Sequence, residues 1–215
     1  MSSYAVIDLE MCRVPKRFKK EGFMLRNELI QIGAVLLDEA HKVVDSFMTY
    51  VLPEYGRVDS YIEGLTGISN DDLKDAPKAE EALEMFAQWL PHDAMLVAWS
   101  DNDEKQIVKE TEAKGLSVPE LDNFMDRWVD CQKTFAEKMD NQRNYKLSEA
   151  LVIADIESEV GEHDALIDAK NTALLFAKME SGEEFTINPY LSGESSAEFG
   201  GYTPFANLLA TMQIA

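Results

Sequence analysis

The order of apolar segments along the chain is the feature that most limits its fold. Five short runs rich in Val, Ile, Leu and aromatic residues suit buried strands, at residues 4–10, 28–38, 42–52, 94–100 and 124–131. The first three follow one another with only loops between them, which predicts antiparallel pairing, whereas helical spacing surrounds the last two, which predicts parallel crossovers. The chain is therefore expected to be an α/β protein with a mixed five-stranded sheet and helices on both faces.

Length and composition fit a single domain followed by an extension. The 215 residues, 46% of them hydrophobic, can form one large core, and the alternating pattern ends near residue 180. We expect a domain of residues 1–180 and a C-terminal extension of residues 181–215 that packs on it. No apolar run approaches the roughly 18 residues needed to cross a membrane, and no secretion signal opens the sequence. We therefore expect a cytoplasmic protein with no membrane partner, in which Cys12 and Cys131 are reduced.

Two carboxylates lie close together on the first predicted strand. Asp8 and Glu10 are two residues apart, so their side chains leave the same face of a strand about 7 Å apart. Buried carboxylates at this distance repel each other and lose hydration unless a proton or a cation compensates. A hard divalent cation such as Mg²⁺ prefers these oxygen ligands. The simpler alternative is a strand that ends at these acids and frays into water, where no site would form.

Further acids follow a later strand and begin the last long helix. The segment "LVAWSDND" ends an apolar run in Asp101 and Asp103, and "HDALIDA" places Asp168 near a helix start. Four carboxylates from three segments can hold two cations roughly 3.5 to 4 Å apart, which stabilise the attacking and leaving oxygens in phosphodiester hydrolysis. His163, five residues before Asp168, supplies an imidazole that can accept a proton from water near neutral pH. The pattern predicts a metal-dependent hydrolytic site.

The charge of the chain is strongly negative but unevenly distributed. Asp and Glu number 40 against 20 Lys and Arg, a formal net charge of −20, which opposes long-range attraction to nucleic acid or anionic membranes. Residues 13–26 are the exception, with six basic residues and one acid. Such a run is commonly a solvated loop. Because it directly follows the strand that carries Asp8 and Glu10, the favoured interpretation is a segment that binds phosphates of a nucleic acid strand beside the metals.

Several segments resemble one enzyme family, in the same order. "VIDLE", "ELIQIGAVLLD", "LTGIS", "WSDND" and "HDALIDA" are similar to the motifs of the DEDDh 3′→5′ exonucleases, over about residues 4–180. The resemblance implies the DnaQ-like variant of the RNase H-like fold and removal of nucleotides from 3′ ends. The spacing from Trp99 to Asp103 is similar to that in the KapD-like and Eri-type branch. This implies a preference for RNA over DNA.

The resemblance also assigns roles within the predicted site. It implies that two Mg²⁺ ions, for which Mn²⁺ can substitute, are bound by four carboxylates, those of Asp8, Glu10, Asp103 and Asp168. It implies that Glu10 is catalytic and that His163 is the general base. In the second motif Asp101 competes with Asp103 for the role of ligand, and Asn102 stands where many members have an aromatic residue.

Five residues are expected to bind the substrate: Met11, Arg13, Lys16, Arg17 and Leu65. The resemblance implies that Met11 offers its backbone NH to the terminal 3′ hydroxyl, although Thr is common after the Glu of this motif. It also implies that Leu65 wedges beside the last base. An alternative of equal weight is that "LTGIS" is only a turn at Gly67, anchored in the core by Leu65 and Ile68.

The expected function is therefore 3′→5′ exonuclease activity on nucleic acid with a single-stranded 3′ end, RNA ahead of DNA, releasing 5′-mononucleotides. The negative charge favours short single-stranded substrates, which need few backbone contacts. Two alternatives stay open at this point. One is a proofreading exonuclease of a polymerase, and the other is an inactive acidic scaffold that binds a basic protein. The presence of His163 argues against the scaffold, which needs no general base.

Overall fold

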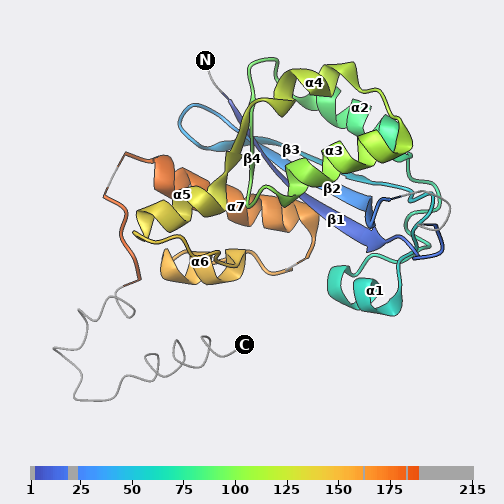
Figure 1. The fold of residues 1–215 in the computed structure, drawn as a ribbon. Helices are drawn as coiled ribbons and strands as arrows, with labels where there is room; N and C mark the ends of the chain where they lie inside the picture. Colours follow the sequence, from blue (N-terminus) through green and yellow to red (C-terminus); the bar gives the residue numbers. More distant parts are fainter. Residues whose placement is uncertain (1–2, 19–23, 162, 183, 189–215) are drawn as a thin grey trace.

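A five-stranded mixed sheet forms the centre of the protein. The computed structural model of the chain describes residues 3–18, 24–161, 163–182 and 184–188, and the strand order is β3-β2-β1-β4-β5 (Figure 1). The strands are β1 Tyr4–Arg13, β2 Asn27–Leu37, β3 Val43–Tyr50, β4 Met95–Ala98 and β5 Trp128–Asp130. The first three pair antiparallel, and β4 and β5 join in parallel. The predicted mixed sheet is confirmed.

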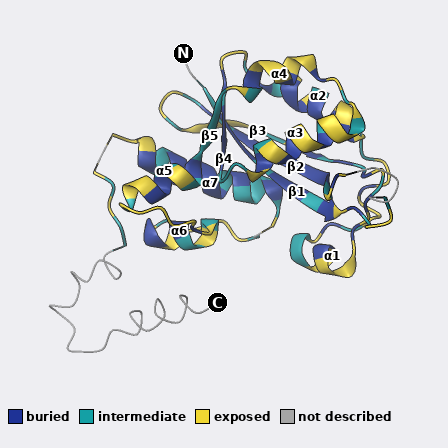
Figure 2. Ribbon diagram, viewed as in Figure 1, coloured by how far each residue is buried: buried dark blue, intermediate teal, exposed yellow. Residues whose placement is uncertain are grey.

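Helices cover both faces of this sheet. They are α1 Ser60–Thr66, α2 Ala79–Trp89, α3 Asn102–Lys114, α4 Pro119–Met125, α5 Cys131–Lys138, α6 Leu147–Ile153 and α7 Ala165–Glu180. In Figure 1, α2, α3 and α4 lie on one face, and α5, α6 and α7 lie on the other. Each face has its own core, one around Phe86 and the other around Phe135 and Phe176. Figure 2 shows the buried residues on the helix sides that face the sheet.

The first strand is longer than the sequence pattern predicts. It continues past the acids to Arg13, because β2 provides pairing partners as far as Asn27. The register shifts between Glu10 and Met11, which marks a bulge directly after the second acid. The prediction that the strand ends at its acids is wrong, and so is the alternative of a fraying end. Asp8 and Glu10 lie inside a paired strand, opposite Gly33 and Gln31 of β2.

The buried side of α7 is not purely apolar. Leu174, although apolar, is 43% exposed. The buried face instead includes two polar residues, Asn171 and Thr172, and the aromatic residue Phe176. The helix packs mainly against β1 and β2, and its backbone approaches β2 closely at Ala165 and Leu166.

The described residues after α7 contact the domain. Phe185 and Ile187 pack against the core beneath α7, and the backbone NH of Asn188 donates a hydrogen bond to the carbonyl of Ile153 at 2.7 Å. Residues 189–215, which make up most of the predicted extension, lie outside the described residues. Among the described helices, none combines the length and apolar character that a membrane crossing requires. Cys12 and Cys131 are both buried free thiols.

Candidate active site

The strand β1 places two carboxylates on the face covered by α7. Val6 belongs to the core beneath α7, and strand alternation therefore directs Asp8 and Glu10 to the same face. Asp8 is half-buried, whereas Glu10 is buried and only 8% exposed. Their common direction agrees with the sequence prediction. The bulge that follows Glu10 ends the regular alternation before the basic residues begin.

A third carboxylate reaches this pair from the first turn of α3. The parallel pairing of β1 with β4 stops at Ile7 and Ala98, which leaves the next part of β1 open on that side. Asp103 occupies this place: it is 7% exposed and accepts a hydrogen bond from the backbone of Leu9. Its competitor Asp101 pairs with two lysines at the surface, at 2.6 and 3.6 Å. The structure thus brings Asp103 to the acidic pair and directs Asp101 to the lysines.

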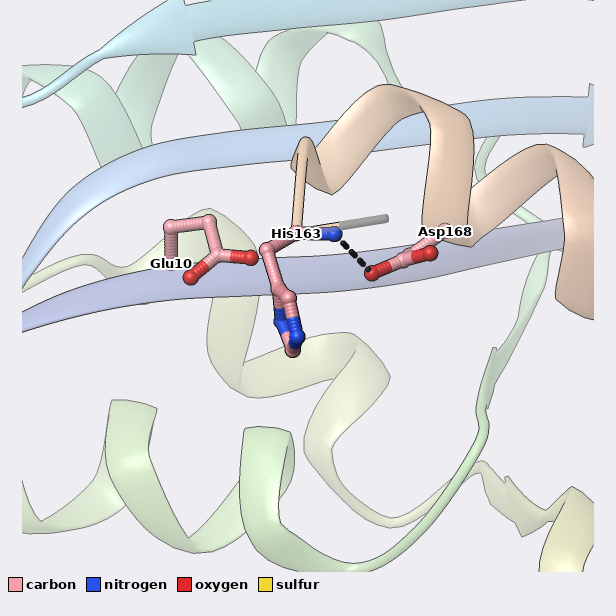
Figure 3. Close-up of side chains that lie close together, drawn as sticks. All are labelled: Glu10, His163 and Asp168. Carbon is pink, nitrogen blue, oxygen red and sulfur yellow. Dashed lines mark hydrogen bonds between the residues drawn. The ribbon is translucent and has the colours of Figure 1, made fainter. Parts of the chain in front are cut away.

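The loop before α7 and its first turn supply His163 and Asp168. One ligand atom from each of Glu10, His163 and Asp168 lies within 4.8 Å of the other two (Figure 3). The backbone NH of His163 donates a hydrogen bond to Oδ2 of Asp168 at 3.0 Å, while the imidazole ring points away from that contact. His163 has a φ of 67°, in the left-handed region that histidine adopts more readily than most residues. The histidine and the second aspartate of "HDALIDA" therefore lie beside Glu10.

Three carboxylates of this site, those of Asp8, Glu10 and Asp103, hold protons more tightly than ordinary acids do. Burial and the neighbouring charges, Asp103 first among them, raise the pKa of Asp8 well above its usual range. Burial and the carboxylate of Asp168 raise the pKa of Glu10 to about 8. Burial raises the pKa of Asp103 to about 7. At neutral pH the site therefore needs protons or cations to offset its charge.

This donor set fits hard divalent cations. The four carboxylates come from β1, α3 and α7, and the imidazole comes from the loop before α7. Burial raises the pKa of Asp8, Glu10 and Asp103, and neighbouring carboxylates add to this for Asp8 and Glu10. Mg²⁺ and Mn²⁺ favour carboxylate oxygens, and a cation that replaces the protons removes the repulsion.

Two residues that position α7 were missed in the sequence. Gln31 is 1% exposed on β2, and its side-chain oxygen accepts a hydrogen bond from the backbone NH of Ala165. Gly33, two residues further on, lies against the backbone of Ala165 and Leu166. A polar residue and a glycine inside an apolar strand were the available signals, because such residues in a buried strand indicate a partner or a close approach of backbone.

The segment "LTGIS" forms the end of α1 and the turn after it. Gly67 caps the helix with a φ of 73°, and Ile68 is buried in a small core beneath α1. The structural reading of these two residues is confirmed. Leu65 is half-buried, and its contact with a substrate base stays a prediction. Met11 is also half-buried and directly follows the bulge.

The basic segment starts on the α1 side of the acidic site. The guanidinium of Arg13 lies over the ring of Tyr61 at 5.6 Å, and that of Arg17 lies over Phe18 at 4.9 Å. Arg13, Lys16 and Arg17 are all exposed. Residues 19–23, with two of the six basic residues, lie outside the described part of the chain. The described cations are thus accessible, and their contact with phosphates stays a prediction.

A hollow in the surface of the described residues adjoins the acidic site. It has a volume of about 480 Å³, and His163, Asp168, Trp99, Tyr145 and Lys146 contribute to its walls. Another hollow, of about 770 Å³, lies between residues 24–27 and α3 and includes none of the predicted carboxylates. The hollow that includes His163 and Asp168 is therefore the candidate site.

Comparison with known proteins decides the family. The sequence profile of the exonuclease family RNase_T matches residues 5–176. The chain belongs to this exonuclease family. The relatives of this exonuclease domain include a PolC-type DNA polymerase III from Caldanaerobacter subterraneus subsp. tengcongensis, 34% identical over 155 residues, and ERI1 exoribonuclease 2 from Danio rerio, 33% identical over 176 residues. The matches cover 72% and 71% of this chain, but only 10% and 31% of the relatives.

Solved structures share the fold of this exonuclease domain. The nuclease domain of 3′hExo, a DEDDh family member bound to rAMP, superposes with a TM-score of 0.72 at 23% identity, over 86% of this chain and 96% of that one. Exonuclease X in complex with 5′ overhanging duplex DNA gives a TM-score of 0.57 at 17% identity, over 86% and 95%. The family and the RNase H-like fold predicted from the motifs are confirmed. DEDDh exonucleases use divalent metal ions, and the acidic cluster is the candidate site for them.

Proposed function

We propose that the chain is a metal-dependent 3′→5′ exonuclease that acts on single-stranded nucleic acid and releases 5′-mononucleotides. The observation that carries this proposal is the convergence of Asp8, Glu10, Asp103 and Asp168, from β1, α3 and α7, around a site that includes His163. Membership in the exonuclease family and the fold of the DEDDh nuclease domains support it.

The four carboxylates would hold two Mg²⁺ ions. Their bound charge would help to deprotonate the attacking water and to stabilise the leaving oxygen of the phosphodiester. The chain itself supplies the proton acceptor, since the exposed imidazole of His163 lies within reach of Glu10 and Asp168 but projects from the end of the loop. Asp168 accepts a hydrogen bond from the backbone NH of His163, and this bond fixes the backbone position from which the imidazole side chain extends.

Two relatives indicate different substrates. ERI1 exoribonuclease 2 is named for RNA, and a structural neighbour is described as a 3′-exonuclease that recognises the 3′ end of a histone mRNA stem-loop, which favours RNA for this chain. The PolC-type DNA polymerase III favours the second candidate, a proofreading exonuclease on DNA. We favour RNA because the spacing from Trp99 to Asp103 is that of the Eri-type branch.

The test is hydrolysis of 5′-labelled single-stranded RNA and DNA oligonucleotides of one sequence, in Mg²⁺, Mn²⁺ or EDTA. We expect a ladder that recedes from the 3′ end in either cation, none in EDTA, and faster hydrolysis of RNA. Asp8→Ala should abolish the ladder. Asp101→Ala is the matched control, because this carboxylate pairs with lysines, and it should retain activity.

Other outcomes separate the alternatives. Faster hydrolysis of DNA, above all of a mismatched 3′ end, would favour proofreading. No ladder in any cation would leave the acidic scaffold, and the search would then turn to basic protein partners. A ladder that survives Asp8→Ala would contradict the proposed site.

A further inference from the structure

The side chain of Gln31 joins the strand sheet to the start of α7. Gln31 lies opposite Glu10 in the antiparallel pairing of β1 with β2, on the face that α7 covers. Its polar side chain is only 1% exposed, and it lies among apolar neighbours in β2. Because a buried amide costs free energy unless its donors and acceptors are satisfied, the partners of Gln31 show what it does.

Both ends of the Gln31 amide contact the first residues of α7. Its oxygen accepts a hydrogen bond from the backbone NH of Ala165 at 3.0 Å, and its nitrogen donates to Oδ2 of Asp164 at 3.4 Å. The other carboxylate oxygen of Asp164 caps the helix by accepting from the NH groups of Leu166 and Ile167, at 3.0 and 3.1 Å. Asp164 is therefore committed to the helix start, which accounts for an acid beside the site that the metal prediction does not use.

Gly33 allows the backbone at the start of α7 to approach β2 closely. A Cβ at Gly33 would lie 2.2 Å from both the carbonyl carbon of Ala165 and the nitrogen of Leu166. The backbone of α7 thus rests directly on β2 at Gly33, two residues from Gln31. Gly33 sets the distance between α7 and β2. The hydrogen bonds of Gln31 fix how far α7 is shifted along its axis and how it is rotated about it.

Ala165 lies between the two functional residues of this element. His163 precedes it by two residues and Asp168 follows it by three. A change in the position of Ala165 would move both side chains relative to Glu10, which belongs to the strand that Gln31 pairs with. A misplacement of about 1 Å in a catalytic group can cost about 10²-fold in rate.

We propose that Gln31 is a positioning residue, which holds His163 and Asp168 at their distance from Glu10 through its paired hydrogen bonds to Ala165 and Asp164. The inference rests on the proposed function for its catalytic consequence, but its effect on metal binding is independent of the substrate. Residues that hold ligands in this way typically contribute 10- to 100-fold to metal affinity or activity.

Other hydrogen bonds hold the loop before α7 to the helix itself. The side chain of Asn171 accepts from the backbone NH of Glu159 at 2.8 Å and donates to its carbonyl at 3.3 Å. These bonds hold the loop to the second turn of α7, so the loop follows the helix as one unit. Gln31 supplies side-chain hydrogen bonds between that unit and β2, and because the packing of α7 on the sheet remains, loss of these bonds should shift the unit without unfolding it.

The experiment compares Gln31→Met with Gln106→Met. Met has nearly the shape of Gln without its hydrogen bonds. Gln106 is the matched control, since it is also buried and donates two hydrogen bonds, to the carbonyl of Asn27 and to Glu110, both at 2.9 Å and outside the acidic site. Urea unfolding, calorimetric titration with Mn²⁺ without nucleic acid, and kcat and KM on an oligonucleotide are measured for both.

We expect the two variants to lose similar stability and to differ in the site. Gln31→Met should bind Mn²⁺ about 10-fold more weakly and lose about 10²-fold in kcat, with KM within about threefold. Gln106→Met should keep its Mn²⁺ affinity and kcat.

Two results overturn the proposal. One is unchanged Mn²⁺ affinity and kcat in Gln31→Met, and the other is an equal loss of both in Gln106→Met, which would make the effect one of general stability. An unaltered chain that binds Mn²⁺ without hydrolysing any oligonucleotide would contradict the proposed function instead, and the comparison of Mn²⁺ affinities would still test Gln31.

Discussion

The backbone NH of His163 donates a hydrogen bond to the carboxylate of Asp168, so the proposed base and a proposed metal ligand are joined through main chain rather than through the imidazole. The ring is left free of this contact and projects beyond it (Figure 3). A side chain that is held at its root and exposed at its tip suits proton transfer to solvent or substrate. The same arrangement makes the roles of the two residues separable by mutation.

We expect His163→Ala and Asp168→Asn to fail in different ways. His163→Ala removes only the proton acceptor, so kcat should fall by about 10²- to 10⁴-fold while Mn²⁺ affinity changes little. Asp168→Asn removes a ligand charge, so Mn²⁺ affinity and activity should fall together. Single-turnover hydrolysis and calorimetry measure the two effects. A large loss of Mn²⁺ affinity in His163→Ala would make the imidazole a ligand instead of a base.

The parts of the site that could be predicted from the sequence are those whose cause is local. The period of a strand places Asp8 and Glu10 on one face, and a helix start places His163 near Asp168. The resemblance already favoured Asp103 over Asp101 through its spacing from Trp99. The structure adds the physical reason: β4 stops pairing with β1 at Ala98, so Asp103 can accept a hydrogen bond from Leu9.

Long-range packing accounts for what could not be predicted. The pairing of β1 beyond its acids depends on β2 continuing to Asn27, and the contacts of Gln31 and Gly33 join residues more than 130 positions apart. No local pattern encodes these distances. The helix α1 is seven residues long and ends at Gly67, too short to show a reliable helical period.

The raised pKa values of the acids predict how stability changes with pH in the absence of cations. In the unfolded chain these carboxyl groups have pKa values of about 4, whereas in the folded chain those of Glu10 and Asp103 are about 8 and about 7. The folded state therefore binds more protons over this interval, and the contribution of the site to stability falls as pH rises from about 4 to about 8. We expect the melting temperature in EDTA to decrease over this range and Mn²⁺ to restore it increasingly.

The control for this pH dependence is Glu10→Gln. It removes one titrating group and should flatten the decrease measured in EDTA. Mn²⁺ must displace the protons, so its affinity should rise with pH and level off above about 8. Calorimetry in buffers of different ionisation enthalpy measures the protons released. Proton release that is absent at pH 6 to 7 would contradict the raised pKa values.

Gly33→Ala should destabilise the protein and displace α7. The added methyl group would meet backbone atoms of Ala165 and Leu166, which cannot move without the helix. Overpacking of this kind costs about 1–3 kcal/mol, and we expect the upper part of that range in urea unfolding. Gly64→Ala is the control: it lies in α1 with open space around it and should be neutral or stabilising by up to about 1 kcal/mol. Equal effects of the two changes would refute the close contact.

A buried ion cluster joins β2, α3 and the loop before α1, and Lys114→Met should disrupt it. The ammonium of Lys114 lies 2.7 Å from Glu28 and 2.8 Å from Glu110, and both carboxylates are fully buried. Glu28 also accepts hydrogen bonds from the backbone of residues 54–56. Lys114→Met leaves the buried carboxylates of Glu28 and Glu110 without their positively charged partner. The free energy of unfolding should therefore fall by about 3–5 kcal/mol. Lys78→Met, which breaks an exposed pair, should change it little.

The basic segment provides the last prediction, a change in salt dependence. If Arg13, Lys16 and Arg17 contact phosphates, their combined replacement by Ala should raise KM and leave kcat near its original value, because such contacts do not change during hydrolysis. Each phosphate contact to a single strand contributes about 0.7 to the slope of log affinity against log salt, so the slope should fall by about 2. Replacement of Lys42, Lys74 and Lys78 removes the same charge elsewhere and should lower the slope much less. Equal slopes in the two triple variants would show that residues 13–26 are a solvated loop, and that the acidic chain holds its substrate mainly through its metals.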